Sequence, residues 1–366
     1  MKPITPVRKV CLVHYSSAPG GIEVLIPTLV RIIPGTLFSA FVIRPPEKGK
    51  ENVYKDIAVD VTYGSLNNLK AARRLRNFAR MNSDALFHCF NTGPFFLLQL
   101  RLTGVKKAVY SIHGTLHFNG ILQKLFRKLI WRMALSSKYR LVANSGHSRD
   151  IFLDFISPLN RSIDVVYNPI GSERMLTGKE GTSADRMNII YAGRLAEGKN
   201  LHRWLDIAAL IHEQHSEARF FIYGDGPLMD ELQRYTLQIG AGGYVTFEGF
   251  MHDIGEVYRK ADLMIFLSEK ESFGNVAVES ILCGTPIIAS AIPSMKEIFI
   301  NYPQFLVPED ERMDEAVLQK LGSLDTLRQS VNDAREEFLV RFSMGQHAEK
   351  IEKIYDSFTG PDGRNK

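Results

Sequence analysis

Two glutamates frame a short turn in the stretch ESFGNVAVE, where seven residues separate Glu271 from Glu279. We expect a helix over roughly 276–283, because Asn275 is a good N-cap and a Gly-Thr-Pro sequence follows that range. Nearly all positions inside the helix are apolar, so Glu279 is expected on a helix with little polar face. A buried carboxylate without a partner is costly. Glu279 therefore needs an internal partner or a ligand.

Glu271 comes directly before the turn at residues 272–275, whose backbone amides are expected to point outward at a helix N-terminus. Such a position suits anionic or hydroxyl-rich ligands. Alternatively, both carboxylates are structural, with Glu271 paired to a nearby lysine and Glu279 to a core arginine. The spacing alone leaves both interpretations open.

Two cations follow the apolar segment that begins the second half of the chain. In the stretch YAGRLAEGKN, a strand is expected to lead Gly193 and Arg194 into a loop, and Lys199 lies at the start of the next helix. Such cations can hold a diphosphate, each charge-assisted hydrogen bond contributing roughly 1.5–3 kcal/mol. The alternative is a pair of solvated surface charges.

Further loops carry weaker signals. Gly20 and Gly21 precede an expected helix, where glycines allow close backbone approach to a phosphate. Gly224 follows another strand, and His113 follows a strand in the stretch SIHGT. Each of these also has an ordinary structural explanation, as a tight turn or a structural histidine.

The motifs that the chain lacks narrow the chemistry. It contains no D-x-D, no H-E-x-x-H and no G-x-x-x-x-G-K-[ST] sequence, and the loop after the first strand lacks G-x-G-x-x-G. We therefore expect no metal site and no dinucleotide cofactor.

Composition indicates an intracellular protein of two domains. The chain has 366 residues, and its three cysteines, Cys11, Cys89 and Cys283, are far apart with no C-x-x-C pair. That pattern argues against a disulfide framework and a thiolate zinc site. No signal-peptide pattern and no run of about 18 apolar residues is present. We expect a cytoplasmic location.

Charge is divided unevenly along the chain. Residues 1–170 carry 24 Lys and Arg against 9 Asp and Glu, whereas residues 171–366 carry 21 against 31. The first half is therefore expected to face an anionic partner. The basic, partly apolar segments 69–80 and 121–140 are suited to an anionic membrane surface. Alternatively, both are helices packed on a sheet with solvated charges. No nucleic-acid-binding motif is present, so nucleic acid is not expected as the partner.

Apolar runs of strand length alternate with longer periodic segments throughout the chain. This alternation predicts doubly wound α/β layers with parallel sheets. The polar stretch 171–186 is the expected linker. Strands are expected at Val10–Tyr15, Phe41–Ile43, Ala85–Cys89, Ala108–Ser111, Arg140–Ala143, Val165–Tyr167, Asn188–Ala192, Arg219–Tyr223, Val245–Glu248, Leu263–Leu267 and Pro286–Ala289.

Taken together, these motifs resemble the retaining glycosyltransferases of family 4, which have the GT-B fold of two facing Rossmann-like domains with a cleft between them. The resemblance rests on GRLAEGKN, FFIYGDGP, VTFEGF and ESFGNVAVESILCGTPIIAS in the second half, and more loosely on GGIE, IHGT and VANSGHSRD in the first. It covers roughly residues 10–357. It implies an acceptor-binding domain over 1–170, a donor-binding domain over 187–344, and a final helix, 345–358, that returns to the first domain.

The resemblance also implies roles for the site residues. Glu271 and Glu279 match the E-x7-E motif, in which Glu279 would hold the ribose hydroxyls and Glu271 the transferred sugar. Arg194 and Lys199 would bind the diphosphate, and His113 would approach the sugar from the other domain. The remaining donor-binding positions would be Gly20, Gly21, Gly193, Gly224, Phe273, Gly274 and Asn275.

By the same resemblance, the activity would be a retaining, metal-independent hexosyl transfer from a UDP- or GDP-sugar. No cofactor beyond the donor would be needed. The acceptor would be a polysaccharide or a lipid-linked oligosaccharide, at the cytoplasmic face of a membrane. Two alternatives remain: a nucleotide-sugar epimerase of the same fold, and a non-catalytic nucleotide-sugar-binding protein.

Overall fold

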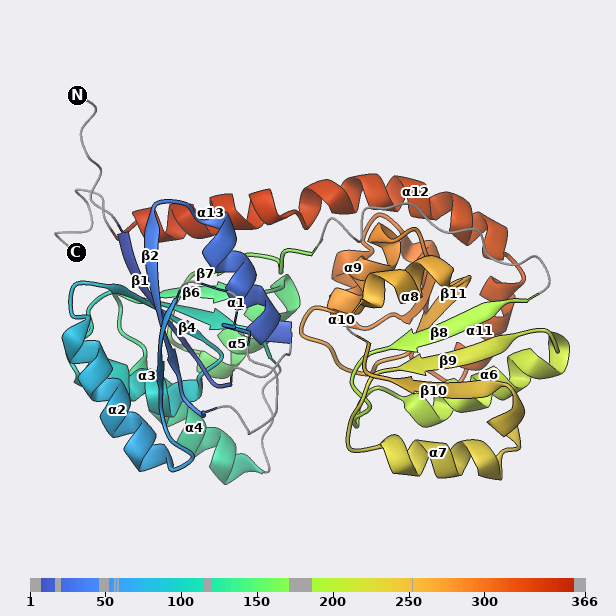
Figure 1. Ribbon diagram of the computed structural model, residues 1–366, viewed down its shortest axis with the longest axis horizontal. Coiled ribbons are helices and arrows are strands. Elements are labelled where there is room, and N and C mark those ends of the chain that lie inside the picture. The colour runs from blue at the N-terminus through green and yellow to red at the C-terminus, as the bar shows by residue number, and fades with distance from the viewer. Residues whose placement is uncertain are drawn as a thin grey trace. The chain divides into compact units, whose positions relative to one another are not determined.

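The computed structural model describes residues 8–16, 21–45, 53–55, 57, 59–114, 120–170, 186–251 and 253–358. The chain forms two compact units, one made of the residues up to Pro169 together with those from Met344 on, and the other of Ile170–Ser343. Figure 1 labels most of their elements. Gly20 and all but the last residue of the expected linker, 171–186, lie outside the described residues.

The first unit is built on a seven-stranded parallel sheet with the order β3-β2-β1-β4-β5-β6-β7. Its strands are β1 (Arg8–His14), β2 (Thr36–Val42), β3 (Asp60–Tyr63), β4 (Leu86–Phe90), β5 (Ala108–Ile112), β6 (Arg140–Ala143) and β7 (Ile163–Val165). Its helices are α1 (Gly21–Ile32), α2 (Asn68–Met81), α3 (Gly93–Leu102), α4 (Ile121–Ala134), α5 (Gly146–Ile156) and α13 (Met344–Asp356).

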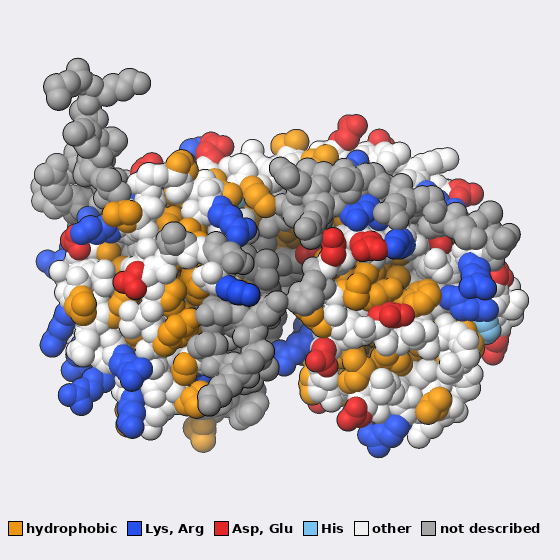
Figure 2. Space-filling model, in the orientation of Figure 1, with side chains coloured by type: hydrophobic (Ala, Val, Ile, Leu, Met, Phe, Trp, Pro, Cys, Tyr) orange, Lys and Arg blue, Asp and Glu red, His pale blue; other side chains and the backbone are white. Residues whose placement is uncertain are grey.

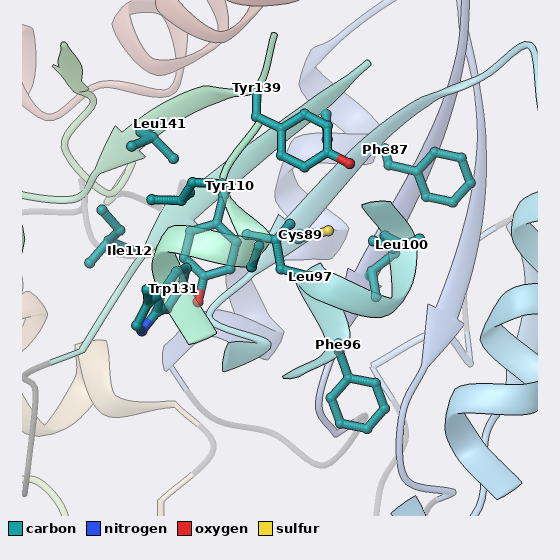
Figure 3. Close-up of a cluster of buried hydrophobic side chains, with 14 of the residues drawn as sticks. Phe87, Cys89, Phe96, Leu97, Leu100, Tyr110, Ile112, Trp131, Tyr139 and Leu141 are labelled. Atoms are coloured by element: carbon teal, nitrogen blue, oxygen red, sulfur yellow. The ribbon is translucent and has the colours of Figure 1, made fainter. Parts of the chain in front are cut away.

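Helices cover both faces of this sheet, which is why its central strands β4 and β5 are buried along their whole length. Helices α2 to α5 pack on one face in a single apolar cluster, and α1 and α13 pack on the other. Figure 3 shows the first cluster, in which Trp131 of α4 lies against Tyr110 of β5 with ring centroids 5.0 Å apart. Phe152 of α5 contacts the same indole edge-to-face at 4.9 Å.

The second unit has a six-stranded parallel sheet with the order β10-β9-β8-β11-β12-β13. Its strands are β8 (Asn188–Ala192), β9 (Arg219–Tyr223), β10 (Val245–Gly249), β11 (Leu263–Phe266), β12 (Ile287–Ser290) and β13 (Leu306–Val307). Its helices are α6 (Leu201–Gln214), α7 (Met229–Gln238), α8 (Ile254–Lys260), α9 (Asn275–Leu282), α10 (Pro293–Ile298), α11 (Met313–Leu321) and α12 (Leu324–Arg341).

The strand order of the second sheet reverses between β8 and β11. The chain proceeds outward from β8 to β9 and β10 on one side, and from β11 to β12 and β13 on the other. Connections that leave neighbouring strands in opposite directions open a crevice beyond the strands' carboxyl ends, where ligands bind in folds of this kind. The loops after β8 and β11 therefore mark the expected ligand position.

The prediction of two doubly wound α/β layers is confirmed, with local differences in the strands. Strand β3 was not predicted because its sequence, DVTY, is not an apolar run, and β13 was not predicted because it has only two residues. Strand β2 begins five residues earlier than expected, at Thr36, and β7 covers 163–165 rather than 165–167. Within the described ranges, no helix is long and apolar enough to cross a bilayer.

Candidate functional site

The loops after β8 and β9 are packed tightly against each other. Gly193 donates its backbone N–H to the Tyr223 carbonyl at 3.0 Å, and Gly224 donates to the Gly249 carbonyl at 2.7 Å. Gly224 has φ +136°, and a Cβ at that position would lie 1.8 Å from the Gly193 carbonyl oxygen. Only glycine allows the two backbones to approach this closely. Gly224 thus fixes the shape of the loop that carries Gly193 and Arg194.

The loop after β8 also meets the loop after β11. The Glu269 N–H donates to the Gly198 carbonyl at 2.9 Å, which joins the two segments. Across this junction Lys199 Nζ forms an ion pair with Glu271 Oε1, and Ser268 Oγ donates to the same oxygen at 3.1 Å. Both members of the ion pair are mostly buried. The lysine partner considered for Glu271 is therefore itself one of the predicted site residues.

Arg194 is the second predicted cation, and its environment differs from that of Lys199. Its side chain is exposed, while its backbone carbonyl accepts a hydrogen bond from the buried Tyr191 hydroxyl at 3.2 Å. The hydrogen bond from Tyr191 thus fixes the backbone of Arg194 on the core side, and the guanidinium remains accessible to an anion.

Helix α9 begins one residue earlier than expected. Gly274, not Asn275, occupies the N-cap position, with φ +111°, and Asn275 is the first helical residue. The expectation that Asn275 caps this helix is wrong, because the turn needs a positive φ that glycine adopts without strain. The Phe273 ring is buried edge-to-face against Phe342, with centroids 5.5 Å apart. A ligand contact from Phe273 must therefore come through its backbone.

Glu279 has a partner inside the protein, one of the two possibilities that the sequence left open. Tyr258 of α8 donates its hydroxyl to Glu279 Oε2 at 3.1 Å, so this partner is a tyrosine and not the core arginine considered above. Burial raises the pKa of Glu279 to about 7, although the tyrosine hydrogen bond acts in the opposite direction. Tyr258 itself is fully buried, and its backbone carbonyl accepts a hydrogen bond from Thr285 Oγ1. The side chain of Glu279 remains partly exposed.

His113 and Gly21 belong to the first unit. Gly21 is the first residue of α1, and His113 follows β5 directly. Burial lowers the pKa of His113 to about 3, so its imidazole is neutral near pH 7. The ring lies 5.9 Å from that of Phe90, which in turn stacks on the buried His88 at 4.0 Å.

Two residues of the site were not predicted. Ser268 lies two residues after the end of β11, so the rule that polar strand-end residues bind ligands could have identified it. Tyr258 gave no such signal, because it lies in a short helix 21 positions before the carboxylate that it contacts. Within the described residues, no group of three or more His, Cys, Asp or Glu could hold a metal ion.

Comparison with known proteins adds two family matches in succession along the chain. The family described as Glycosyltransferase Family 4 matches residues 20–174, and the family described as Glycosyl transferases group 1 matches residues 176–336.

Two curated relatives illustrate the range of the similarity. An uncharacterized glycosyltransferase of Methanocaldococcus jannaschii is 26% identical over 48% of this chain and 46% of its own length. A Vi polysaccharide biosynthesis protein of Salmonella typhi is 29% identical over 40% of this chain and 26% of its own length. The alignments thus span less than half the length of either relative.

Among solved structures, that of Anabaena HepE in complex with UDP and glucose matches with a TM-score of 0.79 at 17% identity. The match covers 96% of this chain and 100% of that one, so the likeness of fold extends over both sheets. The two family matches and this common architecture lead to one conclusion: the chain belongs to the group 1 glycosyltransferases of family 4 and has the GT-B fold.

Proposed function

We propose that this protein is a retaining, metal-independent glycosyltransferase that moves a hexose from a nucleoside diphosphate sugar to a glycan acceptor. The observation that carries the proposal is the meeting of Lys199 with Glu271 beside the start of α9. A cation, a carboxylate and a helix N-terminus together match the groups of a sugar diphosphate: its phosphates, its hydroxyls and its negative charge.

Each group of the donor has a proposed partner. Arg194 and Lys199 bind the diphosphate, close to the backbone of Gly193 and Gly224. Glu279 accepts hydrogen bonds from the ribose hydroxyls, one of its oxygens being held by Tyr258. Glu271 and the backbone of residues 273–275 hold the sugar. Gly20 and Gly21 are proposed as phosphate contacts from the first unit.

The proposed reaction exchanges one bond at the anomeric carbon for another. The bond to the diphosphate oxygen breaks and its electron pair leaves with the diphosphate, whose growing charge Arg194 and Lys199 stabilise. The acceptor oxygen bonds to the same carbon from the leaving-group side, which retains the configuration, and its proton passes to a phosphate oxygen. Glu271 is therefore placed as a sugar-binding group, not as one of a hydrolase's two carboxylates.

His113 is proposed to contact the sugar as a neutral group. Its lowered pKa keeps the imidazole uncharged at neutral pH, so it can exchange hydrogen bonds with a hydroxyl. A protonated imidazole would repel the positive charge that develops on the sugar ring. Burial thus supports a binding role and argues against a cationic one.

The nucleotide and the acceptor are inferred from relatives. A UDP- or GDP-sugar is proposed as donor, in line with the UDP in the HepE complex. A polysaccharide or lipid-linked oligosaccharide is proposed as acceptor, in line with the Vi polysaccharide role named for the Salmonella relative. The reaction would take place at the cytoplasmic face of a membrane, which the basic first half of the chain would contact.

A ligand screen followed by turnover tests the proposal. UDP-, GDP- and ADP-sugars are compared by thermal shift, and the stabilising donor is then used in a transfer assay with Lys199→Ala. Loss of this one preorganised cation should lower turnover roughly 10²–10³-fold. The control is Lys296→Ala, an exposed lysine on α10. Normal transfer by Lys199→Ala would refute the assignment, and conversion of the donor without any acceptor would indicate an epimerase.

A further inference from the structure

Most large apolar side chains of helix α4 point to solvent, whereas a helix packed on a sheet normally turns them toward the core. Trp131, 4% exposed, and Ala134 face the core. Six large apolar side chains of the same helix are exposed to solvent, and Leu122 reaches 84%. They are Ile121, Leu122, Leu125, Phe126, Leu129 and Met133.

The exposed set forms one continuous face. Residues of a helix are separated by about 100° around its axis, so these six fall within an arc of about 140°, directly opposite Trp131 and Ala134. An amphipathic surface helix normally turns such a stripe toward the core. A clustered apolar face that stays in water marks an interaction surface.

Charge identifies the kind of partner. Lys124, Lys128 and Arg132 follow one border of the apolar face, and α4 contains no acidic residue. Between residues 64 and 140 the only acidic residue is Asp84, whose carboxylate is paired with Lys9 at 2.8 Å. On the face that Figure 2 shows, Lys and Arg side chains predominate over Asp and Glu in the first unit. An apolar face bordered by uncompensated cations is complementary to an anionic lipid surface.

Helix α2, the other basic segment, does not share this arrangement. Its apolar face is buried in the core through Ala71, Leu75 and Phe78, and Arg74 donates to the Tyr63 and Gly64 carbonyls at 3.1 and 2.7 Å. For α2 the alternative of a packed helix with solvated charges is therefore correct. Of these two helices, α4 is the one whose exposed large apolar side chains form a continuous face.

The position of α4 in the fold connects this face with the candidate site. The helix follows β5, and only residues 114–120 separate it from His113. Because a crossover helix runs opposite to its strand, the first turns of α4 lie at the carboxyl edge of the sheet. Those turns carry Ile121, Leu122 and Leu125.

We propose that α4 inserts its apolar face into the interface of a bilayer that contains anionic phospholipid. Its cations contact the headgroups, and His113 is thereby held near the membrane surface, where a lipid-linked acceptor is presented. The inference rests on the proposed function only for the acceptor. Binding of α4 to lipid does not depend on the donor site.

The first test measures partition of the full chain onto vesicles. Wild-type protein should sediment with vesicles of phosphatidylcholine and phosphatidylglycerol, with less bound as the anionic fraction falls or salt rises. Leu122→Ser/Leu125→Ser should weaken partition roughly tenfold or more, because two leucine side chains no longer enter the apolar part of the bilayer. The control is Leu237→Ser on α7, which removes a leucine 72% exposed elsewhere. Equal binding by the double variant, or no binding by wild type, would overturn the proposal.

A second test distinguishes insertion from surface attachment. Phe126→Trp adds an exposed indole, whereas the two native tryptophans, Trp131 and Trp204, are buried. On anionic vesicles its emission should shift to the blue and be quenched by lipids brominated on the acyl chain, while Leu237→Trp should do neither. Absence of quenching in bound protein would refute insertion. If wild type is a dimer, the double serine variant is a monomer and neither binds vesicles, the apolar face of α4 would instead be an interface with a second copy of the chain.

These results are separable from those on the donor site. Donor binding is followed by thermal shift in solution, without vesicles. A Leu122→Ser/Leu125→Ser protein that leaves the vesicles but still responds to donor supports the role of α4. If wild-type protein shows no thermal shift with any donor, only the proposed function would be contradicted.

Discussion

The Tyr258 hydroxyl donates a hydrogen bond to Glu279 Oε2 at 3.1 Å and so joins α8 to α9 behind the candidate site. This bond fixes one oxygen of the carboxylate. It also partly offsets the effect of burial, which raises the pKa of Glu279. Tyr258 is therefore a positioning residue for the carboxylate proposed to hold the ribose, although it lies within the core.

Replacing Tyr258 by phenylalanine should weaken donor binding and leave the chemical step nearly intact. The variant keeps the ring and loses only the hydroxyl, so Glu279 becomes both less ordered and harder to ionise. We expect the donor Kd to rise roughly ten- to hundredfold, the range for a hydrogen bond to a charged group. Calorimetry with the UDP-sugar gives Kd, and steady-state kinetics should place the effect in KM.

Tyr235→Phe supplies a matched control. It removes another tyrosine–carboxylate bond, from Tyr235 to Asp206 at 2.6 Å, on α7 and α6 of the same unit. Equal losses of affinity in the two variants would contradict a specific role for Tyr258.

Donor affinity should increase with pH across neutrality. The pKa of Glu279 is about 7, so the carboxyl is largely protonated at pH 6 and largely ionised at pH 8, where it accepts ribose hydrogen bonds better. The phosphates of an intact UDP-sugar are both esterified and do not titrate in this range. Calorimetry between pH 6 and 8 should show Kd falling for wild type, with a flatter profile for Glu279→Gln. A profile that Glu279→Gln leaves unchanged would assign the titration to another group.

The same carboxyl should make the donor-free protein less stable in base. Its folded pKa lies above the ordinary value of 4.5, so the folded state binds this proton more tightly than the unfolded state. The contribution to stability is therefore complete below pH 4.5 and is lost as the pH rises toward 7. At pH 8 we expect the free energy of unfolding of Glu279→Gln, measured with denaturant, to exceed that of wild type by about 1–3 kcal/mol. At pH 5 we expect no such gain. A gain that is equal at both pH values would contradict the assignment.

Neutralising Glu271 should separate nucleotide binding from transfer. In the proposed site Glu271, which is paired with Lys199, would compete with the diphosphate for this lysine, so Glu271→Gln should tighten binding of free nucleoside diphosphate roughly three- to tenfold. Transfer should nevertheless fall, because the carboxylate proposed to bind the sugar is lost. Glu269→Gln, an exposed neighbour, is the control for both measurements. Weaker nucleotide binding by Glu271→Gln would argue against competition.

The contact between the loops after β8 and β9 should be intolerant of a methyl group. Gly224→Ala places a Cβ 1.8 Å from the Gly193 carbonyl oxygen and should cost roughly 2–4 kcal/mol of stability. Gly240→Ala is the matched control, because Gly240 also has positive φ, +74°, but has no atom within 4 Å of the added Cβ. Equal losses in thermal unfolding would attribute the whole effect to backbone strain.

Sequence patterns were sufficient to predict the position of a residue where its neighbours in the chain determine that position. Each of Lys199 and Glu271 follows a strand, so their shared edge of the sheet could be predicted. Their ion pair could not, because it joins positions 72 apart through a loop junction. Likewise, the apolar and basic residues of α4 were visible in the sequence. Which side of that helix faces the core depends on Trp131, and only tertiary packing decides that.

The course of the chain between the two units has a consequence for its synthesis. The second unit is an insertion into the first, and its two ends are joined by the Ile170 N–H to Phe342 carbonyl bond of 2.9 Å. The first unit needs α13, whose Tyr355 hydroxyl hydrogen-bonds the buried His88 at 2.6 Å. A nascent chain emerging from a ribosome can therefore complete the second unit first. The first unit, although mostly synthesised earlier, waits for α13, which follows the second unit in the chain.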